Sequence, residues 1–521
     1  MFYDYFFMKR ITGLALCLSI MGSVAGCGAS SAEMTAEETQ SHGLSGSAKI
    51  NYSAPVQTPG TLVDQVGYPS GSEKAVLFKA EEPPKEFYVC DLDSGSRVYT
   101  GEIQRSVYSE SLSEYVCAGY FNELKTPGRY CIYTDELGES YSFSIGEDVY
   151  GDVFSEALRK YYVNRCGIST SESYAGEITH SACHTTMAHL QENEAVAVDV
   201  TGGWHMDETA GRDAALGSRI AETLLLAYEM NPSAFTDNLG IPESGNGIPD
   251  ILDEVRYEAQ WLLKMQDTKT GGVYGAAVTE GAKGTDVFAL PVLVTPVSMD
   301  ATISFAAMMG RFSFFYQQYD ADFATTALKA ADRAFSCFLN NQKTADNTAA
   351  FKAAAQLYRA TGSDSYKGVL EECFERSDFE ELFKKDENVF LGCVTYLTIN
   401  QKVDVERCTY LMKLLMQLSE DIARRASETG YLVTDPADGD DFSEFLRQMR
   451  TLTITDHIIY NYEYTTIIEN HIHYLAGMNP SAVNYLTSDT DRPYSAADRT
   501  GIMNNPESDA LLIFILSVLE Q

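Results

Sequence analysis

Residues Phe235–Asp267, with the sequence FTDNLGIPESGNGIPDILDEVRYEAQWLLKMQD, contain a strong helical signal in their second half. Apolar side chains recur there at the spacing of one helical face, at Ile251, Leu252, Val255, Ala259, Leu262 and Leu263. Pro249 precedes them, and proline suits the first turn of a helix because its missing N–H has no intrahelical acceptor there. The stretch therefore predicts an amphipathic helix over 249–265.

The same period dominates the chain on both sides of this stretch, from Val149 to the C-terminus, and strand alternation is nearly absent. Further helices are expected over 303–316, 324–339, 349–361, 405–425, 465–475 and 508–519. Some 370 successive residues of this kind form either a superhelical array or a closed toroid of helical hairpins. The lack of a fixed-period repeat argues against the array.

Residues 60–147 differ in pattern, because short β-rich runs alternate with turns. The runs KAVLF, EFYVCDL, YVCAGYF and GRYCIYT are separated by turns such as DSGS and TPG. This pattern predicts a small sandwich of immunoglobulin type.

The N-terminus has the features of an export signal. Lys9 and Arg10 precede an apolar run over 11–24, which is short for a membrane span. The run ends in SVAGC, which resembles a bacterial lipobox and predicts lipidation of Cys27 after removal of residues 1–26. The alternative is an ordinary signal peptide. Residues 27–59 lack periodicity and are expected to be a flexible tether, so the protein would be exported and lipid-anchored on the outer face of a bacterial cell membrane.

The composition of the chain limits the classes of molecule that it is expected to bind. Its 521 residues carry a net charge of −36, with 74 acidic and 38 basic side chains. Nucleic acid is therefore not expected as a partner, because neutralising phosphates requires clustered Lys and Arg. Of 11 cysteines, nine lie outside the export region, and an odd number argues against a complete disulfide framework.

Three segments carry residue types that bind metals. NRCGIST contains Cys166, THSACHTTMAHL contains Cys183 and His184, and GGWH contains His205. Two thiolates and two imidazoles are the ligand set of a closed tetrahedral zinc site. Their spacing is irregular, so two buried cysteines and two unrelated histidines are the alternative.

Several motifs together resemble family 9 of the glycoside hydrolases. DQVGYPSGSEKAVLF is similar to the start of the immunoglobulin-like domain that precedes many members. RCG, HSACHT, DVTGGWH, LLLAYEMNP, the stretch 235–267 and YLAGMNPSAVNY then follow in the family's order. The resemblance covers nearly everything from residue 61 onward, and 235–267 is its most specific part.

The resemblance implies a multi-domain protein in which an all-β immunoglobulin-like sandwich (60–147) precedes an all-α (α/α)6 toroid (148–521). It implies an inverting, endoglucanase-type hydrolysis of β-glucans or plant polysaccharides. It also implies a structural zinc ion at Cys166, Cys183, His184 and His205. Whether calcium binds as well is left open.

The catalytic positions of this family are altered in the present chain. Members carry Asp-Ala-Gly-Asp after the histidine, whereas this chain has Met206, Asp207, Glu208 and Thr209. The position of the family's glutamate acid is occupied by Met503, when Asp509 is aligned with the Asn that opens the last helix.

Two hypotheses follow. Either hydrolysis persists, with Asp207 or Glu208 as base and Glu507 as acid, or the toroid has lost hydrolysis and binds a glycan or a protein at the cell surface. Trp204 is the candidate for stacking against sugar, as one of only two tryptophans in the chain.

Overall fold

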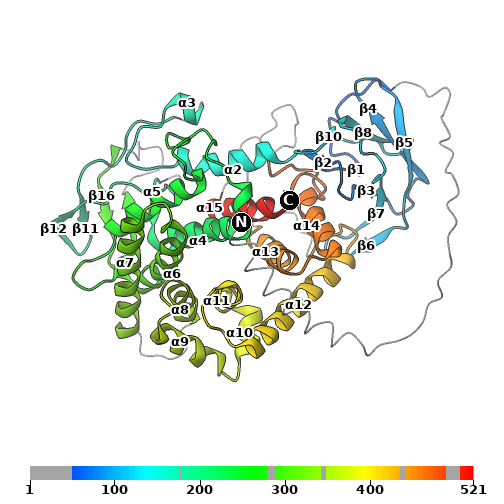
Figure 1. Cartoon of the computed structure of the whole chain (residues 1–521). Helices are drawn as coiled ribbons and strands as arrows, with labels where there is room; N and C mark the ends of the chain where they lie inside the picture. Colours follow the sequence, from blue (N-terminus) through cyan, green and yellow to red (C-terminus); the bar gives the residue numbers. More distant parts are fainter. Residues whose placement is uncertain are drawn as a thin grey trace.

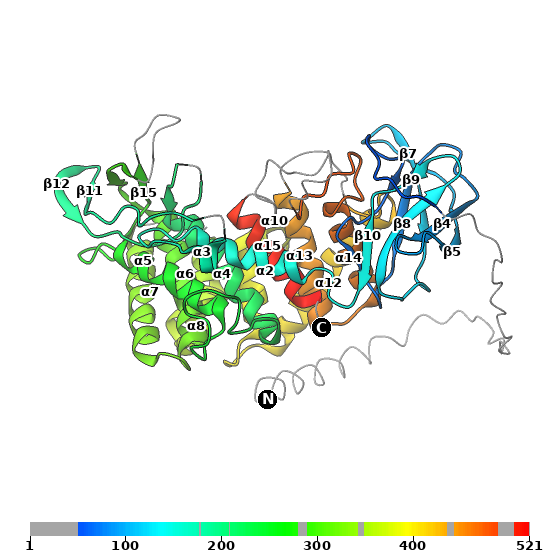
Figure 2. The same cartoon turned by 90° about the horizontal axis from the view of Figure 1, so that it is seen from above.

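The computed structural model describes residues 50–176, 179–207, 209–279, 289–341, 348–434, 442–487 and 505–519. A β domain occupies one end of the molecule, and the helices fill the rest (Figures 1 and 2). The predicted order of a small β domain followed by a large helical domain is confirmed.

The β domain consists of two sheets packed face to face. One sheet has the order β1 (Thr61–Leu62), β3 (Ala75–Lys79), β7 (Glu114–Tyr120) and β6 (Val107–Ser109). The other has the order β2 (Gly67–Pro69), β10 (Phe143–Gly146), β8 (Gly128–Thr134), β4 (Glu86–Asp91) and β5 (Arg97–Glu102), with β9 (Gly138–Glu139) beside β8. The pairing is antiparallel except between β2 and β10. Phe78, Phe87, Phe121 and Phe143 are buried between the sheets, as the alternation of apolar residues requires.

Six helices pack against one another through the middle of the helical domain. They are α4 (Ala214–Met230), α6 (Met299–Tyr316), α8 (Thr348–Thr361), α11 (Glu387–Thr398), α13 (Ser443–Ile458) and α15 (Pro506–Leu519). Helix α4 contacts both α6 and α15, α8 contacts α6 and α11, and α13 contacts α15. An ion pair between Arg450 and Glu387, 2.8 Å apart, joins α13 to α11.

The other helices lie further out (Figure 1). They are α2 (Gly151–Val163), α3 (Glu172–Ala175), α5 (Asp250–Lys264), α7 (Ala321–Asn341), α9 (Asp364–Phe374), α10 (Phe379–Lys385), α12 (Val405–Ser427) and α14 (Tyr462–Leu475), with the short helix η1 (Pro232–Ala234) after α4. The central helices and the outer helices differ in the share of their residues that is buried. Eleven of the fourteen residues of α15 are buried, against nine of the twenty-three of α12. A helix that is apolar all round must be covered on every side, whereas an amphipathic one covers the core with one face.

The near absence of strands expected after Val149 is wrong. A sheet with the order β12 (Asn193–Val198), β11 (Ala188–Leu190), β16 (Val292–Val294), β15 (Ala276–Thr279) and β13 (Arg212–Asp213) lies at the far end from the β domain (Figure 2). Strands β14 (Val273–Tyr274) and β17 (Val297–Ser298) form a further pair. These strands are two to six residues long, and β12 is almost wholly exposed, so no alternation of burial marks them in the sequence.

The two domains are joined by buried polar contacts. The backbone N–H of Gln65 donates to the carbonyl of Ala476, and its side-chain amide donates to the carbonyl of Ala482 at 2.7 Å. Asp64 and His473, both fully buried, lie 2.8 Å apart. The motif YLAGMNPSAVNY therefore includes the surface on which the β domain docks.

Candidate metal centre and cleft

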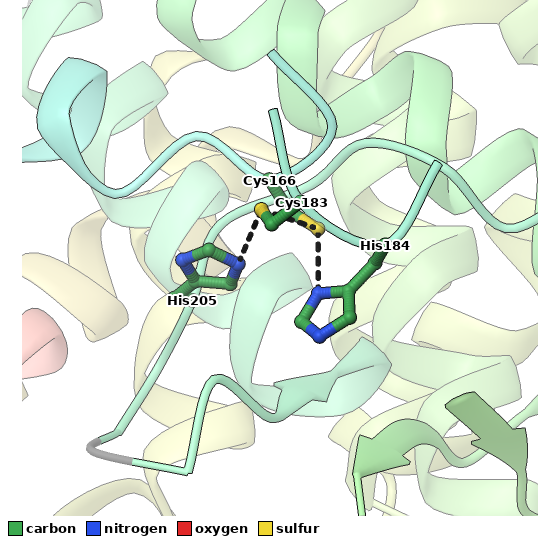
Figure 3. Close-up of side chains that lie close together, drawn as sticks. All are labelled: Cys166, Cys183, His184 and His205. Carbon is green, nitrogen blue, oxygen red and sulfur yellow. Dashed lines mark hydrogen bonds between the residues drawn. The ribbon is translucent and has the colours of Figure 1, made fainter. Parts of the chain in front are cut away.

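Cys166, Cys183, His184 and His205 converge at one buried point (Figure 3). One ligand atom from each lies within 4.8 Å of all the others. The two sulfurs are 3.7 Å apart, Cys166 Sγ is 3.3 Å from His184 Nδ1, and Cys183 Sγ is 3.5 Å from His205 Nε2.

Backbone pairing brings Cys166 and His205 together. The segment after α2 runs beside the segment after Gly202: Cys166 N–H donates to Gly203 O, and His205 N–H donates to Asn164 O, each at 2.8 Å. Gly203 is required here, because its φ is +78° and a Cβ would collide with the ring of Trp261. Main-chain bonds thus join two of the three segments, and the third is reached by the N–H of Gly167, which donates to Cys183 Sγ at 3.4 Å.

For two of the four side chains the surroundings favour the protonation state that a metal needs. Hydrogen bonds with Cys166 and with neighbouring histidines lower the pKa of Cys183, which favours its thiolate, whereas the hydrogen bond with Cys183 and burial raise the pKa of Cys166. Burial lowers the pKa of His205, which favours the neutral imidazole. Thiolate sulfur and neutral imidazole nitrogen are the species that coordinate zinc.

The spacing of the ligand atoms also fits a tetrahedral ion. With zinc bond lengths of about 2.3 Å to sulfur and about 2.0–2.1 Å to nitrogen, the ligand atoms should lie roughly 3.4–3.8 Å apart. Three of the six distances, 3.3 to 3.7 Å, agree, and the other three are within 4.8 Å. Within the described ranges no second group of three or more His, Cys, Asp or Glu side chains converges in this way.

The loop after His205 is built differently. Asp207 is exposed, and its Oδ1 accepts hydrogen bonds from the N–H and hydroxyl of Thr209, at 2.8 and 2.6 Å, and from the N–H of Gly211 at 3.2 Å. Asp213 caps α4 by accepting the N–H of Leu216 at 2.8 Å. Glu208, Met503 and Cys27 lie outside the described residues.

A cavity of about 160 Å³ lies among the central helices. Its lining includes Glu507, in the first turn of α15, and residues mostly from the N-terminal halves of the other central helices. Asp207 is not part of this lining. Asp509 lies two residues further along α15 and is buried, with its Oδ2 2.6 Å from Nζ of Lys160. Burial raises the pKa of Asp509 to about 7.

The expectation that Trp204 stacks on sugar is wrong. Trp204 is 1% exposed and packs against Tyr161, with ring centroids 4.9 Å apart. Its indole N–H donates to Glu254. Trp261 is fully buried as well, so both tryptophans serve the core, and neither offers a face to a ligand.

Sequence analysis missed the charged side chains of the cavity. Glu222 and Lys352 form an ion pair at 2.8 Å, both about 5% exposed, and Arg450 is equally buried beside Glu387. A signal was present for Glu222 and Lys352, because these charges interrupt otherwise apolar helical runs, whereas the helix around Arg450 is rich in polar residues. Only the packing of α4, α8 and α13 shows that they face one cavity.

Comparison with solved structures identifies the fold. The fold resembles a metagenome-derived glycoside hydrolase family 9 endoglucanase, with a TM-score of 0.77 and 23% identity over 88% of this chain and 98% of that one. It also resembles a Zn-binding triple mutant of the family 9 endoglucanase J30, with a TM-score of 0.75 and 22% identity over 87% and 100% of the two chains. The fold is thus that of a two-domain glycoside hydrolase.

The chain belongs to glycosyl hydrolase family 9, whose family model matches residues 150–497. The cellulase N-terminal ig-like domain matches residues 56–139. A cellodextrinase of Butyrivibrio fibrisolvens is 27% identical over 83% of this chain and 85% of its own length. Endoglucanase D of Acetivibrio thermocellus is 27% identical over 82% and 72%. The family resemblance predicted from the motifs is confirmed.

No helix in the described part of the chain has the length and apolarity needed to cross a membrane.

Proposed function

We propose that this protein is an exported hydrolase of β-glucan or related plant polysaccharide, working in a cleft over the central helices. This proposal rests on the observation that the carboxylate of Glu507 lines the central cavity of a family 9 domain. The related cellodextrinase and endoglucanase support a glucan substrate. The six central helices and the helices outside them are proposed to form the two layers of an (α/α)6 toroid.

Inverting hydrolysis needs two carboxyl groups on opposite sides of the scissile bond. Glu507 is proposed to protonate the leaving oxygen, while Asp207 or Glu208 removes a proton from the attacking water. Such pairs are separated by roughly 6.5–9.5 Å, which leaves room for that water. The test is release of reducing sugar from a panel of β-glucans, with the anomer of the first product followed by NMR. Release of the inverted anomer is expected, and retention would exclude this mechanism.

A second function, glycan binding without hydrolysis, is supported by the loop at 206–211. Met206 and Thr209 cannot act as bases, and one oxygen of Asp207 already accepts three hydrogen bonds of its own turn. If the parent is inactive on every glucan, the triple change Met206→Asp, Thr209→Asp and Met503→Glu tests this function. Recovered hydrolysis would show that the cleft still accepts the glucan and lacks only the carboxyl groups.

The cluster of Cys166, Cys183, His184 and His205 is proposed to hold one structural zinc ion. Four protein ligands leave no open position for water, so the metal would stabilise the fold and take no part in hydrolysis. Elemental analysis of the purified chain is expected to find one zinc per molecule.

Cys27 is proposed to carry the lipid that anchors the protein to the membrane. A Cys27→Ala variant is expected to leave the membrane fraction. Equal recovery of variant and parent with membranes would contradict the anchor.

A further inference from the structure

Basic side chains from four of the central helices line the cavity that contains Glu507. They are Arg219 of α4, Arg311 of α6, Lys352 of α8 and Arg450 of α13. The chain as a whole has 38 basic residues against 74 acidic ones. Four basic groups around one small cavity therefore run against the composition of the molecule.

Carboxylates line the cavity too, and most of them are already paired. Glu222 pairs with Lys352, Glu387 with Arg450, and Asp300 with Arg219. Arg311 pairs with Glu229, which also binds Arg359, and Arg447 binds Glu387. Counted with Glu444, which also pairs with Arg447, the lining and its partners comprise six basic and six acidic side chains, so the charges balance and an added anion depends on donors that still lack an acceptor.

Two of the guanidinium groups keep a buried donor without an acceptor. The Nε–H groups of Arg311 and Arg450 have no hydrogen-bond partner among the described residues, and these side chains are only 3% and 5% exposed. A buried charged donor that lacks an acceptor is unfavourable. A ligand with several acceptor oxygens would supply the missing acceptor to both Nε–H groups.

The described lining residues include no aromatic side chain. Pockets for neutral ligands are usually lined by apolar and aromatic groups with few polar ones. Guanidinium groups instead match the planar, two-oxygen geometry of a carboxylate. The cavity is therefore suited to a sugar that carries a charge.

We propose that this cavity binds an anionic sugar unit of the glycan, with its acidic group received by Arg450, Arg311 and Lys352 and with Arg219 at the mouth. The inference rests on the proposed function, because it requires that a glycan enter this cleft. The net charge of −36 does not oppose it at close range, since charges are screened beyond about 8 Å at physiological ionic strength.

The test compares matched tetrasaccharides by calorimetry on the whole mature chain. Cellotetraose and a tetramer of β-1,4-linked glucuronic acid differ only in the carboxylate at C6, and sulfated cellotetraose carries the other common anionic group. At low salt we expect the glucuronic acid tetramer to bind about tenfold tighter than cellotetraose or better, as charge-assisted hydrogen bonds allow. A stronger response to the sulfated sugar would identify sulfate as the preferred anionic group.

Substitutions of single basic residues test which side chains receive the acidic group. Arg219→Gln should weaken binding of the acidic tetramer about two- to fivefold, as for an exposed charge. Arg450→Lys keeps the charge but loses the paired donors of the planar guanidinium, and it should weaken binding of the acidic tetramer about tenfold. The matched control is Arg256→Gln, since Arg256 and Arg219 have similar exposure and ion-pair length. The control should bind like the parent.

Equal or weaker binding of the acidic tetramer, or equal effects of Arg219→Gln and Arg256→Gln, would overturn the inference. Hydrolysis of neutral glucans with no preference for the acidic tetramer would overturn the inference while leaving the proposed function intact. Binding of neither tetramer, together with no hydrolysis of the glucan panel, would overturn both.

Discussion

Gly203–His205 and Met206–Gly211 are neighbours in the chain, yet they are supported in different ways. The first segment is buried, paired with Asn164–Cys166 and held by Glu258, which accepts the N–H of Trp204 at 2.9 Å. The second exposes Asp207 and Thr209 and is closed by the side chain of Asp207 within its own turn. The first contains His205 of the four-residue cluster, and the second has Met206 and Thr209 at the positions where the family resemblance predicts aspartates.

The comparison shows that adjacent residues can be supported independently. A change in the buried segment would disturb contacts among three chain segments. A change in the turn closed by Asp207 alters only local hydrogen bonds. The turn can therefore diverge while the cluster of Cys166, Cys183, His184 and His205 is kept.

The largest expected effect is on activity, and it concerns the exposed turn. If the parent hydrolyses glucan, the double change Asp207→Asn and Glu208→Gln should reduce the rate by about 10²–10⁴-fold, as removal of a general base does. Initial rates of reducing-sugar release measure this. Zinc content should stay unchanged, and undiminished activity would place the base elsewhere.

The next effect is on stability, and it concerns the buried segment. Cys183→Ser removes one ligand and should lower the free energy of unfolding by about 3 kcal/mol or more, because a structural metal contributes directly to folding. Denaturant unfolding and elemental analysis measure the two quantities. Cys393→Ser is the matched control, since Cys393 is fully buried and lies outside the cluster. The same loss in both variants, with zinc absent from the parent, would refute the metal centre.

A third effect concerns the carboxyl group beneath the buried segment. Burial raises the pKa of Glu258 from 4.5 to about 8. Between these values the folded chain keeps a proton that the unfolded chain has released, so stability falls as the pH rises, by up to about 1.4 kcal/mol per pH unit. Glu258→Gln should flatten this slope. Unfolding measured at pH 5, 6.5 and 8 tests it, with the exposed Glu428→Gln as control, and an unchanged slope would assign the pH dependence to other groups.

The smallest expected effect concerns Asp213, and it distinguishes a carboxylate that only caps a helix from the candidate catalytic bases. Asp213→Ala removes the N-cap of α4 and should cost about 1 kcal/mol, whereas Asp213→Asn should be nearly neutral because Asn caps equally well. Thermal unfolding measures both. A large loss of activity in a stable Asp213→Asn variant would show that Asp213 has a chemical role.

Helices with one apolar face were predictable from the sequence. Helix α5 occupies 250–264 where 249–265 was expected, and α12 occupies 405–427 where 405–425 was expected. The predicted ranges missed α2, α4, α9, α10, α11 and α13. In α13 the buried residues include Arg450, Thr451, Thr453 and Thr455. Polar side chains buried in a helix interface remove the periodic contrast on which the sequence signal depends.

By itself, the sequence determined the order of the domains and the family, because each depends on residue type and local pattern, whereas the four residues of the cluster followed from the family resemblance and not from their irregular spacing. Only the tertiary structure showed that both tryptophans are buried, that Asp213 is a helix cap, and that Glu507 shares a cavity with arginines from distant helices. These features depend on which helix faces meet. That choice is made by the burial of side chains far apart in the chain, and no local pattern records it.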